Sequence, residues 1–205
     1  DVLSSGRVTL GCGVGWLKEE FMLLNSESFH SRGVVTNEYI QAMIELWTQS
    51  DPSFNGKYIE FSKVLFNPKP MQKPYPPIWI GGESKAAIKR AAKLGNGWFP
   101  LSQNQTFPLQ TNTQLNVAIQ SLNKELDFQK RDINNFDIVF RPEWANLDEN
   151  KSEILNSKSG DIIDNILEIK KLGVTHVLFY FPKIELAQLD EILEIFADKI
   201  IKQLS

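Results

Sequence analysis

The stretch Ile78-Trp79-Ile80-Gly81-Gly82-Glu83-Ser84 decides the fold class. Its first three residues favour a strand, and the two glycines that follow end that strand. Ser84 is a good helix N-cap, and Ile88, Ala91 and Ala92 recur after it at helical spacing. A strand that passes through a glycine turn into a helix is a βα unit. The sequence therefore predicts an α/β protein with parallel strands.

Further short apolar runs predict the other strands. Working outward from residues 78–80, these strands are residues 7–10, 97–99, 136–140 and 176–181. Amphipathic helical patterns separate them, as expected for consecutive βα units rather than for a sandwich or a bundle. The Pro-rich stretch 67–77 is expected to be an extended connection, because proline lacks the amide that a helix needs.

The helices are predicted from apolar residues that share one face. These residues are Ile40, Met43, Ile44 and Trp47; Leu115, Ile119, Leu122 and Leu126; Ile162, Ile166 and Ile169; and Leu189, Leu193, Phe196 and Ile200. Gly95 and Gly173 each follow a helical pattern and are expected to be left-handed C-caps. No linker divides the pattern, so residues 1–205 are expected to form one domain.

Composition excludes several classes of protein. The 205 residues include 22 basic and 25 acidic side chains, a formal charge of −3, and no basic stripe suggests a nucleic-acid partner. No apolar run approaches a membrane span, and no signal peptide opens the chain, so a cytoplasmic protein is expected. One cysteine and two histidines exclude an internal disulfide and Cys-rich zinc motifs.

Gly81, Gly82, Glu83 and Ser84 are the first candidate site. They lie at the predicted carboxyl end of a parallel strand, where α/β proteins place their ligands. Glycines let backbone amides approach an anion closely, and the start of a helix favours a phosphate there. The alternative is that the glycines only make a tight turn and Ser84 only caps the helix.

Gly13, Val14, Gly15 and Trp16 are the second candidate site. With Gly11, the alternating glycines would clear one face of the loop, so that a flat ring could lie against the backbone. This pattern is not the dinucleotide fingerprint, which would place glycine where Trp16 stands. The alternative is close packing of the loop on a neighbouring strand.

Other ionisable or nucleophilic residues have no diagnostic spacing: His30, His176, Glu19, Glu20, Glu143 and Cys12. We expect His30 in a surface loop and His176 at a structural position. Cys12 is expected to be a small buried residue, because no partner for a nucleophile is identifiable. Glu143 lies beyond a predicted strand end and could face a ligand. No catalytic residue and no metal ligand is assigned.

Several segments together resemble the luciferase-like monooxygenase family, the flavin- and deazaflavin-dependent oxidoreductases built on a (β/α)8 TIM barrel. The segments that carry the resemblance are residues 5–11, 13–16, 32–39, 46–47, 67–70, 77–82 and 91–98. Their order and spacing agree with the family from about residue 3 to residue 101, and beyond that the resemblance is only general.

The resemblance implies a role for both glycine loops. In the family, the loop matching Gly81–Ser84 binds the cofactor phosphate, and the loop matching residues 13–16 lies near the ring system. The cofactor would be FMN or an 8-hydroxy-5-deazaflavin coenzyme. The protein would be a flavin-dependent oxidoreductase or monooxygenase that acts on paired donors, with incorporation or reduction of molecular oxygen, and takes a small-molecule substrate.

One departure limits the transfer of residues. The family barrel has eight strands and this chain shows about five, so the barrel is expected to be incomplete, with its N-terminal βα units missing. No catalytic base is carried over for that reason. Unpaired strand edges at residues 7–10 and 176–181 predict self-association as a homo-oligomer, or aggregation, and poor cofactor binding by this chain alone.

Three alternatives stay open. The protein could be a deazaflavin-dependent enzyme that transfers hydride without oxygen. It could be a non-catalytic flavin-binding protein or a truncated inactive paralogue. It could also be a complete flavodoxin-like domain with five strands and its phosphate at Gly81 and Gly82.

Overall fold

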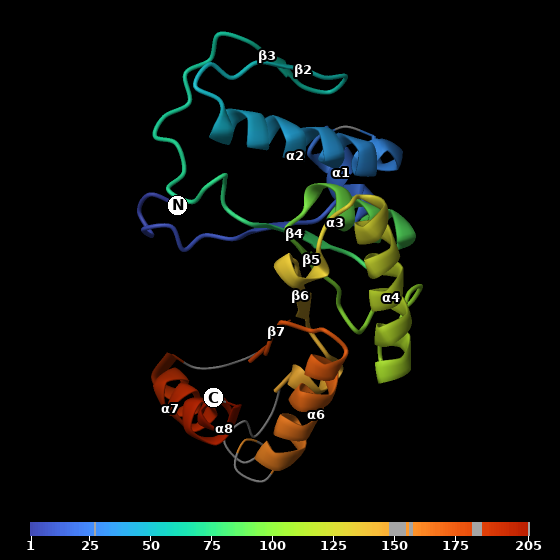
Figure 1. Ribbon diagram of the computed structural model, residues 1–205, viewed down its shortest axis with the longest axis vertical. Helices are drawn as coiled ribbons and strands as arrows, with labels where there is room; N and C mark the ends of the chain where they lie inside the picture. The colour runs from blue at the N-terminus through green and yellow to red at the C-terminus, as the bar shows by residue number, and fades with distance from the viewer. Residues whose placement is uncertain (27, 148–154, 156–157, 182–185, 205) are drawn as a thin grey trace. The chain divides into compact units, whose positions relative to one another are not determined.

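The computed structural model describes residues 1–26, 28–147, 155, 158–181 and 186–204. Strands and helices alternate along the chain (Figure 1). The chain divides into two compact units. The first contains Asp1–Trp98 and Glu125–Phe136, and the second contains Phe99–Lys124 and Asp137–Ser205.

The first unit is built on neighbouring strands in the order β1 (Leu10–Cys12), β4 (Ile78–Gly81) and β5 (Gly97–Phe99). β1 is parallel to β4, with Leu10 opposite Ile78 and Cys12 opposite Ile80. The alternation of parallel strands and helices confirms the predicted α/β class. The predicted strands at residues 78–80 and 97–99 are both present.

The prediction of a first strand at residues 7–10 was wrong, because β1 begins only at Leu10. Residues 1–6 form a turn instead, closed by the Gly6 amide, which donates to the Asp1 carbonyl at 2.9 Å. The Leu10 amide makes the first ladder bond, to the Pro77 carbonyl at 2.8 Å. Pro76 and Pro77 have no amide to donate, so pairing cannot extend toward residue 7.

The first unit also contains helices α1 (Lys18–Leu23), α2 (Arg32–Thr48) and α3 (Lys85–Leu94). The 3-10 turn η1 (Phe29–Ser31) lies between α1 and α2. α3 buries Ile88, Ala91 and Ala92 as predicted. α2 buries Ile40 fully, whereas Met43, Ile44 and Trp47 are half-buried.

Gly95 is not the left-handed C-cap that was predicted, since its φ is −90°. Glycine is needed there for space. A Cβ on Gly95 would lie 2.8 Å from Cγ1 of Ile80 and 3.1 Å from the Ala91 carbonyl oxygen. Close packing of α3 on β4, rather than backbone conformation, thus fixes the residue. At Gly173 the prediction was correct, with φ +106°.

A short hairpin of β2 (Phe54–Asn55) and β3 (Glu60–Phe61) was not predicted. The Glu38 carboxylate on α2 holds its loop by accepting hydrogen bonds from the amides of Tyr58 at 2.6 Å and Ile59 at 2.8 Å. The connection over residues 67–77 contains no helix, as predicted.

The second unit pairs β6 (Asp137–Phe140) in parallel with β7 (His176–Val177). β7 is shorter than the predicted strand at residues 176–181, because the chain leaves β6 and bridges from Tyr180 to Asn146. α6 (Ser159–Lys171) packs its predicted isoleucines inward, and the unit ends in α7 (Leu186–Phe196), the π-helical turn η4 (Ala197–Ile201) and α8 (Lys202–Leu204).

The core of the second unit includes Leu147, Leu155, Ile162, Ile166, Ile192 and Ile200. Among the α7 residues whose burial is described, Ile192 is buried, and Leu193, predicted to face inward, is 46% exposed. The four predicted core residues of α4 (Asn112–Phe128), a helix that spans the boundary between the units, are buried. Within the described part of the chain, no helix is both long and apolar enough to cross a membrane.

Candidate functional site

The two glycine loops predicted from sequence begin side by side in the first unit. Because Cys12 lies opposite Ile80 in a parallel pair, Gly13 and Gly81 leave the same edge of the sheet. That edge is the carboxyl end of both strands, where α/β proteins bind ligands. Residues far apart in the sequence thus meet at one place.

The loop Gly81–Ser84 is shaped by its second glycine. Gly82 has φ +111°, a conformation that L side chains rarely adopt, and a Cβ there would lie 3.1 Å from Cβ of Ala87. Ser84 caps α3, because its Oγ accepts a hydrogen bond from the Ala87 amide at 3.2 Å. The tight turn and the cap anticipated from sequence are therefore both present.

The same geometry provides the features that bind anions. α3 begins directly after the loop and carries no acidic residue in its first turn. Its amino end has amides without partners inside the helix, together with the positive end of the helix dipole. A phosphate is the kind of group that such a helix start favours. Glu83 could contribute its backbone but not its carboxylate, since two anions repel.

Trp98 on β5 contacts this loop and was not selected as a site residue from the sequence. Its side chain is fully buried, and its indole Nε1–H donates a hydrogen bond to the Gly82 carbonyl at 2.8 Å. Its sequence signals are its position next to Gly97 in a predicted strand and its place in segment 91–98, which resembles the family, and neither assigns it to a site. The contact depends on how β5 lies beside β4, which spacing alone does not reveal.

The glycines of the other loop differ in their surroundings. A Cβ on Gly11 or Gly13 would meet no other described atom within 4 Å, so this stretch of backbone is open as predicted. Gly15 instead has φ +80°, and a Cβ there would lie 2.6 Å from the Phe21 ring. Gly15 therefore packs closely, but on the Phe21 ring of helix α1 and not on a neighbouring strand. Val14 is half-buried, and Trp16 is 83% exposed.

Arg32 fixes the far end of this loop. Its Nε donates to the Gly15 carbonyl at 3.2 Å, and its Nη1 donates to the Phe29 carbonyl at 2.8 Å. The guanidinium also lies over the Phe29 ring, 3.8 Å from the ring centre. These contacts tie the glycine loop to the start of α2.

Cys12 is the last residue of β1 and directly precedes the loop of residues 13–16. It is half-buried rather than buried, and burial raises the pKa of its thiol above the usual value. A raised pKa disfavours the thiolate, which is the nucleophilic form. Cys12 therefore has the character of a packing residue, although it is less buried than predicted.

The remaining candidates lie elsewhere. His30 is exposed but belongs to η1 rather than to a loop. Glu19 and Glu20 are exposed on α1, and Glu143 is exposed at the start of a short 3-10 turn, η3 (Glu143–Ala145). Among the described residues, no group of three His, Cys, Asp or Glu side chains could hold a metal ion.

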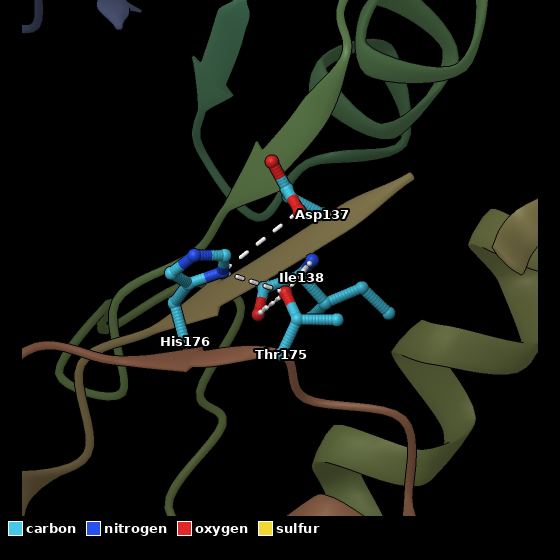
Figure 2. Close-up of polar contacts among 4 residues, drawn as sticks. All are labelled: Asp137, Ile138, Thr175 and His176. Carbon is cyan, nitrogen blue, oxygen red and sulfur yellow. Dashed lines mark hydrogen bonds and ion pairs between the residues drawn. The ribbon is translucent and has the colours of Figure 1, made fainter. Parts of the chain in front are cut away.

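His176 takes part in a polar cluster at the amino ends of β6 and β7 (Figure 2). Thr175 Oγ1 accepts from the Ile138 amide at 2.9 Å and lies 2.8 Å from Nδ1 of His176. The same Nδ1 lies 3.9 Å from Oδ1 of Asp137. Because both neighbours share one ring nitrogen, this is not a relay of the Ser-His-Asp type. The cluster holds two strands together.

Solved structures with a similar arrangement show the fold. The monooxygenase RslO1 from Streptomyces bottropensis superposes with a TM-score of 0.75 and 17% identity, covering 100% of this chain and 71% of that one. The coenzyme F420-dependent tetrahydromethanopterin reductase from Methanopyrus kandleri superposes with a TM-score of 0.68 and 14% identity, covering 99% of this chain and 76% of that one. The fold is that of the TIM-barrel enzymes, of which this chain has a part.

Sequence comparison defines the family. The model of the family described as luciferase-like monooxygenase matches residues 1–142, more than half of the chain. The chain belongs to the luciferase-like monooxygenase family. The FMNH(2)-dependent dimethylsulfone monooxygenase of Pseudomonas putida is 33% identical over 101 residues, which are 48% of this chain and 28% of that protein. The chain thus matches about a third or less of the length of such curated relatives.

Proposed function

We propose that Gly81, Gly82, Glu83 and Ser84 bind the phosphate of a flavin-type cofactor, and that Gly13, Val14, Gly15 and Trp16 lie beside its ring system. The observation that carries this proposal is the register of β1 on β4, which starts both loops at the same carboxyl edge. Cofactors that combine an anionic group with a flat ring need both kinds of surface close together.

The residues present fit such a cofactor. Gly82 leaves the backbone bare at the start of α3, and Ser84 holds that start in place. Gly13 leaves open space beside the second loop, and Trp16 offers an exposed aromatic side chain for contact with a ring. The cofactor would supply the redox chemistry, and the chain would anchor it, orient it and shield it from water.

We infer that the protein is an oxidoreductase with FMN as cofactor, a monooxygenase that acts on paired donors with incorporation or reduction of molecular oxygen. Its substrate would be a small molecule. Support comes from membership of the luciferase-like monooxygenase family and from the similarity to a relative named as FMNH(2)-dependent. In this proposal residues 1–205 are part of one luciferase-like domain.

A second candidate is a hydride-transferring oxidoreductase that uses an 8-hydroxy-5-deazaflavin coenzyme. The similarity to a reductase described as coenzyme F420-dependent favours it. Both cofactors carry a phosphate and a planar ring system, so the same two loops would serve either of them.

Cofactor titration followed by oxygen measurement tests the proposal. For a protein in which residues 1–205 are joined to about three further βα units that complete the family barrel, we expect FMN or the deazaflavin coenzyme to bind, and the preference between them identifies the reaction. Oxygen uptake with reduced FMN supports the monooxygenase, whereas hydride transfer without oxygen uptake supports the second candidate. Binding without turnover would identify a non-catalytic cofactor-binding protein. Binding of neither cofactor would remove both candidate functions.

A further inference from the structure

The hydrogen bond between Trp98 and Gly82 joins a buried side chain to the loop that contains the proposed phosphate site. Trp98 comes from β5, whereas the loop follows β4, so the bond crosses between neighbouring strands. An indole has one donor and no acceptor, and a buried donor needs a partner. The Gly82 carbonyl is that partner, at 2.8 Å.

This bond fixes the plane of one peptide group. The Gly82 carbonyl and the Glu83 amide belong to the same planar trans peptide, and they point in opposite directions. When the carbonyl is held toward the Trp98 indole, the amide is held toward the other side. Gly82 has the conformational freedom to let this plane rotate, so a contact from outside the loop is needed to set it.

We propose that Trp98 is a positioning residue for the cofactor phosphate, acting through the peptide group that joins Gly82 to Glu83. This inference rests on the proposed function of the loop and adds a residue to it. Trp98 itself would not touch the phosphate. It would keep the loop in the conformation that binds the phosphate, so that little ordering remains to be done when the cofactor arrives.

The test uses the same protein with its barrel completed and compares each cofactor with its phosphate-free form. The probes are FMN against riboflavin, and the deazaflavin coenzyme against 8-hydroxy-5-deazariboflavin. Trp98→Phe removes the indole donor and keeps an aromatic ring. Trp47→Phe is the matched control, because Trp47 is half-buried on α2 and packs on Tyr75. Circular dichroism first confirms that both variants fold.

We expect Trp98→Phe to weaken binding of the phosphorylated probe about fivefold, the size of one neutral hydrogen bond, and to leave the phosphate-free probe unchanged. Trp47→Phe should leave both affinities unchanged. Equal weakening of both probes by Trp98→Phe, or no weakening, would overturn the positioning role. If the native protein does not distinguish the two probes, the phosphate site itself fails, and this inference fails with it.

A measurement on the native protein covers the case in which Trp98→Phe does not fold. The five tryptophans each give one indole N–H signal in a nitrogen-15 spectrum, and Trp→Phe variants at the other four positions assign Trp98 by elimination. Hydrogen exchange of the Trp98 indole should slow when FMN or the deazaflavin coenzyme binds, and should not slow with the phosphate-free probe. Equal exchange with both probes would contradict the proposal.

Discussion

Arg90 on α3 donates a hydrogen bond from Nε to Oδ1 of Asn37 on α2, at a distance of 2.5 Å. Its Nη2 also donates to the Gly33 carbonyl at 3.0 Å. The side chain is only 8% exposed, and burial lowers the pKa of Arg90, with a further lowering by the charge of Arg32. Gly33 has no room for a side chain, because a Cβ would lie 2.8 Å from that Nη2. The guanidinium thus joins two helices that the sequence suggests only as separate patterns.

Replacing Arg90 by lysine should lower the free energy of unfolding by about 1 to 3 kcal/mol. Lysine keeps the charge but cannot reproduce the two-pronged contact with Asn37 and Gly33. Urea unfolding followed by circular dichroism measures the change. Arg7→Lys is the matched control, because Arg7 is exposed and its Nε donates to the nearby Ser4 carbonyl. Equal midpoints for the two variants would show that the contact contributes nothing to stability.

Replacing Gly82 by valine should weaken cofactor binding about tenfold or more. The branched side chain would crowd the backbone where a phosphate oxygen is proposed to meet amides, and a lost charged hydrogen bond has that effect on affinity. Isothermal titration with FMN and with the deazaflavin coenzyme measures it in a protein that has all eight strands of the family barrel. Gly160→Val is the control, because a Cβ on Gly160 meets no other described atom within 4 Å. A folded Gly82→Val protein with native affinity would exclude this loop from the site.

Glu38 should make the stability of the first unit depend on pH. Desolvation raises the pKa of Glu38, but hydrogen bonds from the amides of Tyr58, Ile59 and Lys57 and the charge of Lys57 outweigh this and lower it overall. Because the pKa is lowered on folding, the Glu38 carboxylate stabilises the folded protein at pH values above its unfolded pKa of about 4.3. This stabilisation is lost as the pH falls through the pKa of Glu38 in the folded protein.

The measurement for Glu38 is thermal unfolding between pH 3 and pH 7. We expect the native protein to be more stable than Glu38→Gln near pH 7, and the difference in stability to shrink below about pH 4. Glu60→Gln on the exposed side of the same hairpin is the control. A difference that stays constant over the whole range would disprove a role for the carboxylate charge.

Cys12 should react slowly with thiol reagents. Burial raises the pKa of its thiol, so less thiolate is present at pH 8 than in a free cysteine. The rate of alkylation by iodoacetamide should be lower in the folded protein than in urea. Cys12 is the only cysteine of the chain, so the assay reports on one site. Equal rates in the two states would show that the thiol is accessible and normally ionised.

Local patterns predicted most of the helices correctly. α3 and its cap at Ser84 depend on residues within a few positions of one another, and the apolar face of α4 repeats without interruption. Such patterns depend on helix geometry, which is the same in every protein. The resemblance to the family was likewise carried by local motifs, and the match over residues 1–142 confirms it.

Three features that the sequence analysis missed share a physical cause, because each depends on a neighbour that lies far away in the sequence. β1 begins where the Pro77 carbonyl can accept a hydrogen bond, not where the residues first favour a strand. Residue 95 must be glycine because the side chain of Ile80 leaves no room for a Cβ, and not because of the φ angle of Gly95. Trp98 reaches Gly82 only because two strands lie side by side. None of these relationships has a signature at short spacing.

The pairing of β1 with β4 also has a consequence for how the chain folds. The segment between Leu10 and Ile78 contains α1, α2 and the hairpin, so pairing of β1 with β4 closes a long loop of chain. Closing this loop costs conformational entropy before the two strands make any contact. β4, α3 and β5, in contrast, follow one another directly and can associate early. We expect pulsed hydrogen exchange during refolding to show amides of β4 and α3 protected before those of β1. The edge that carries both glycine loops would then be completed last.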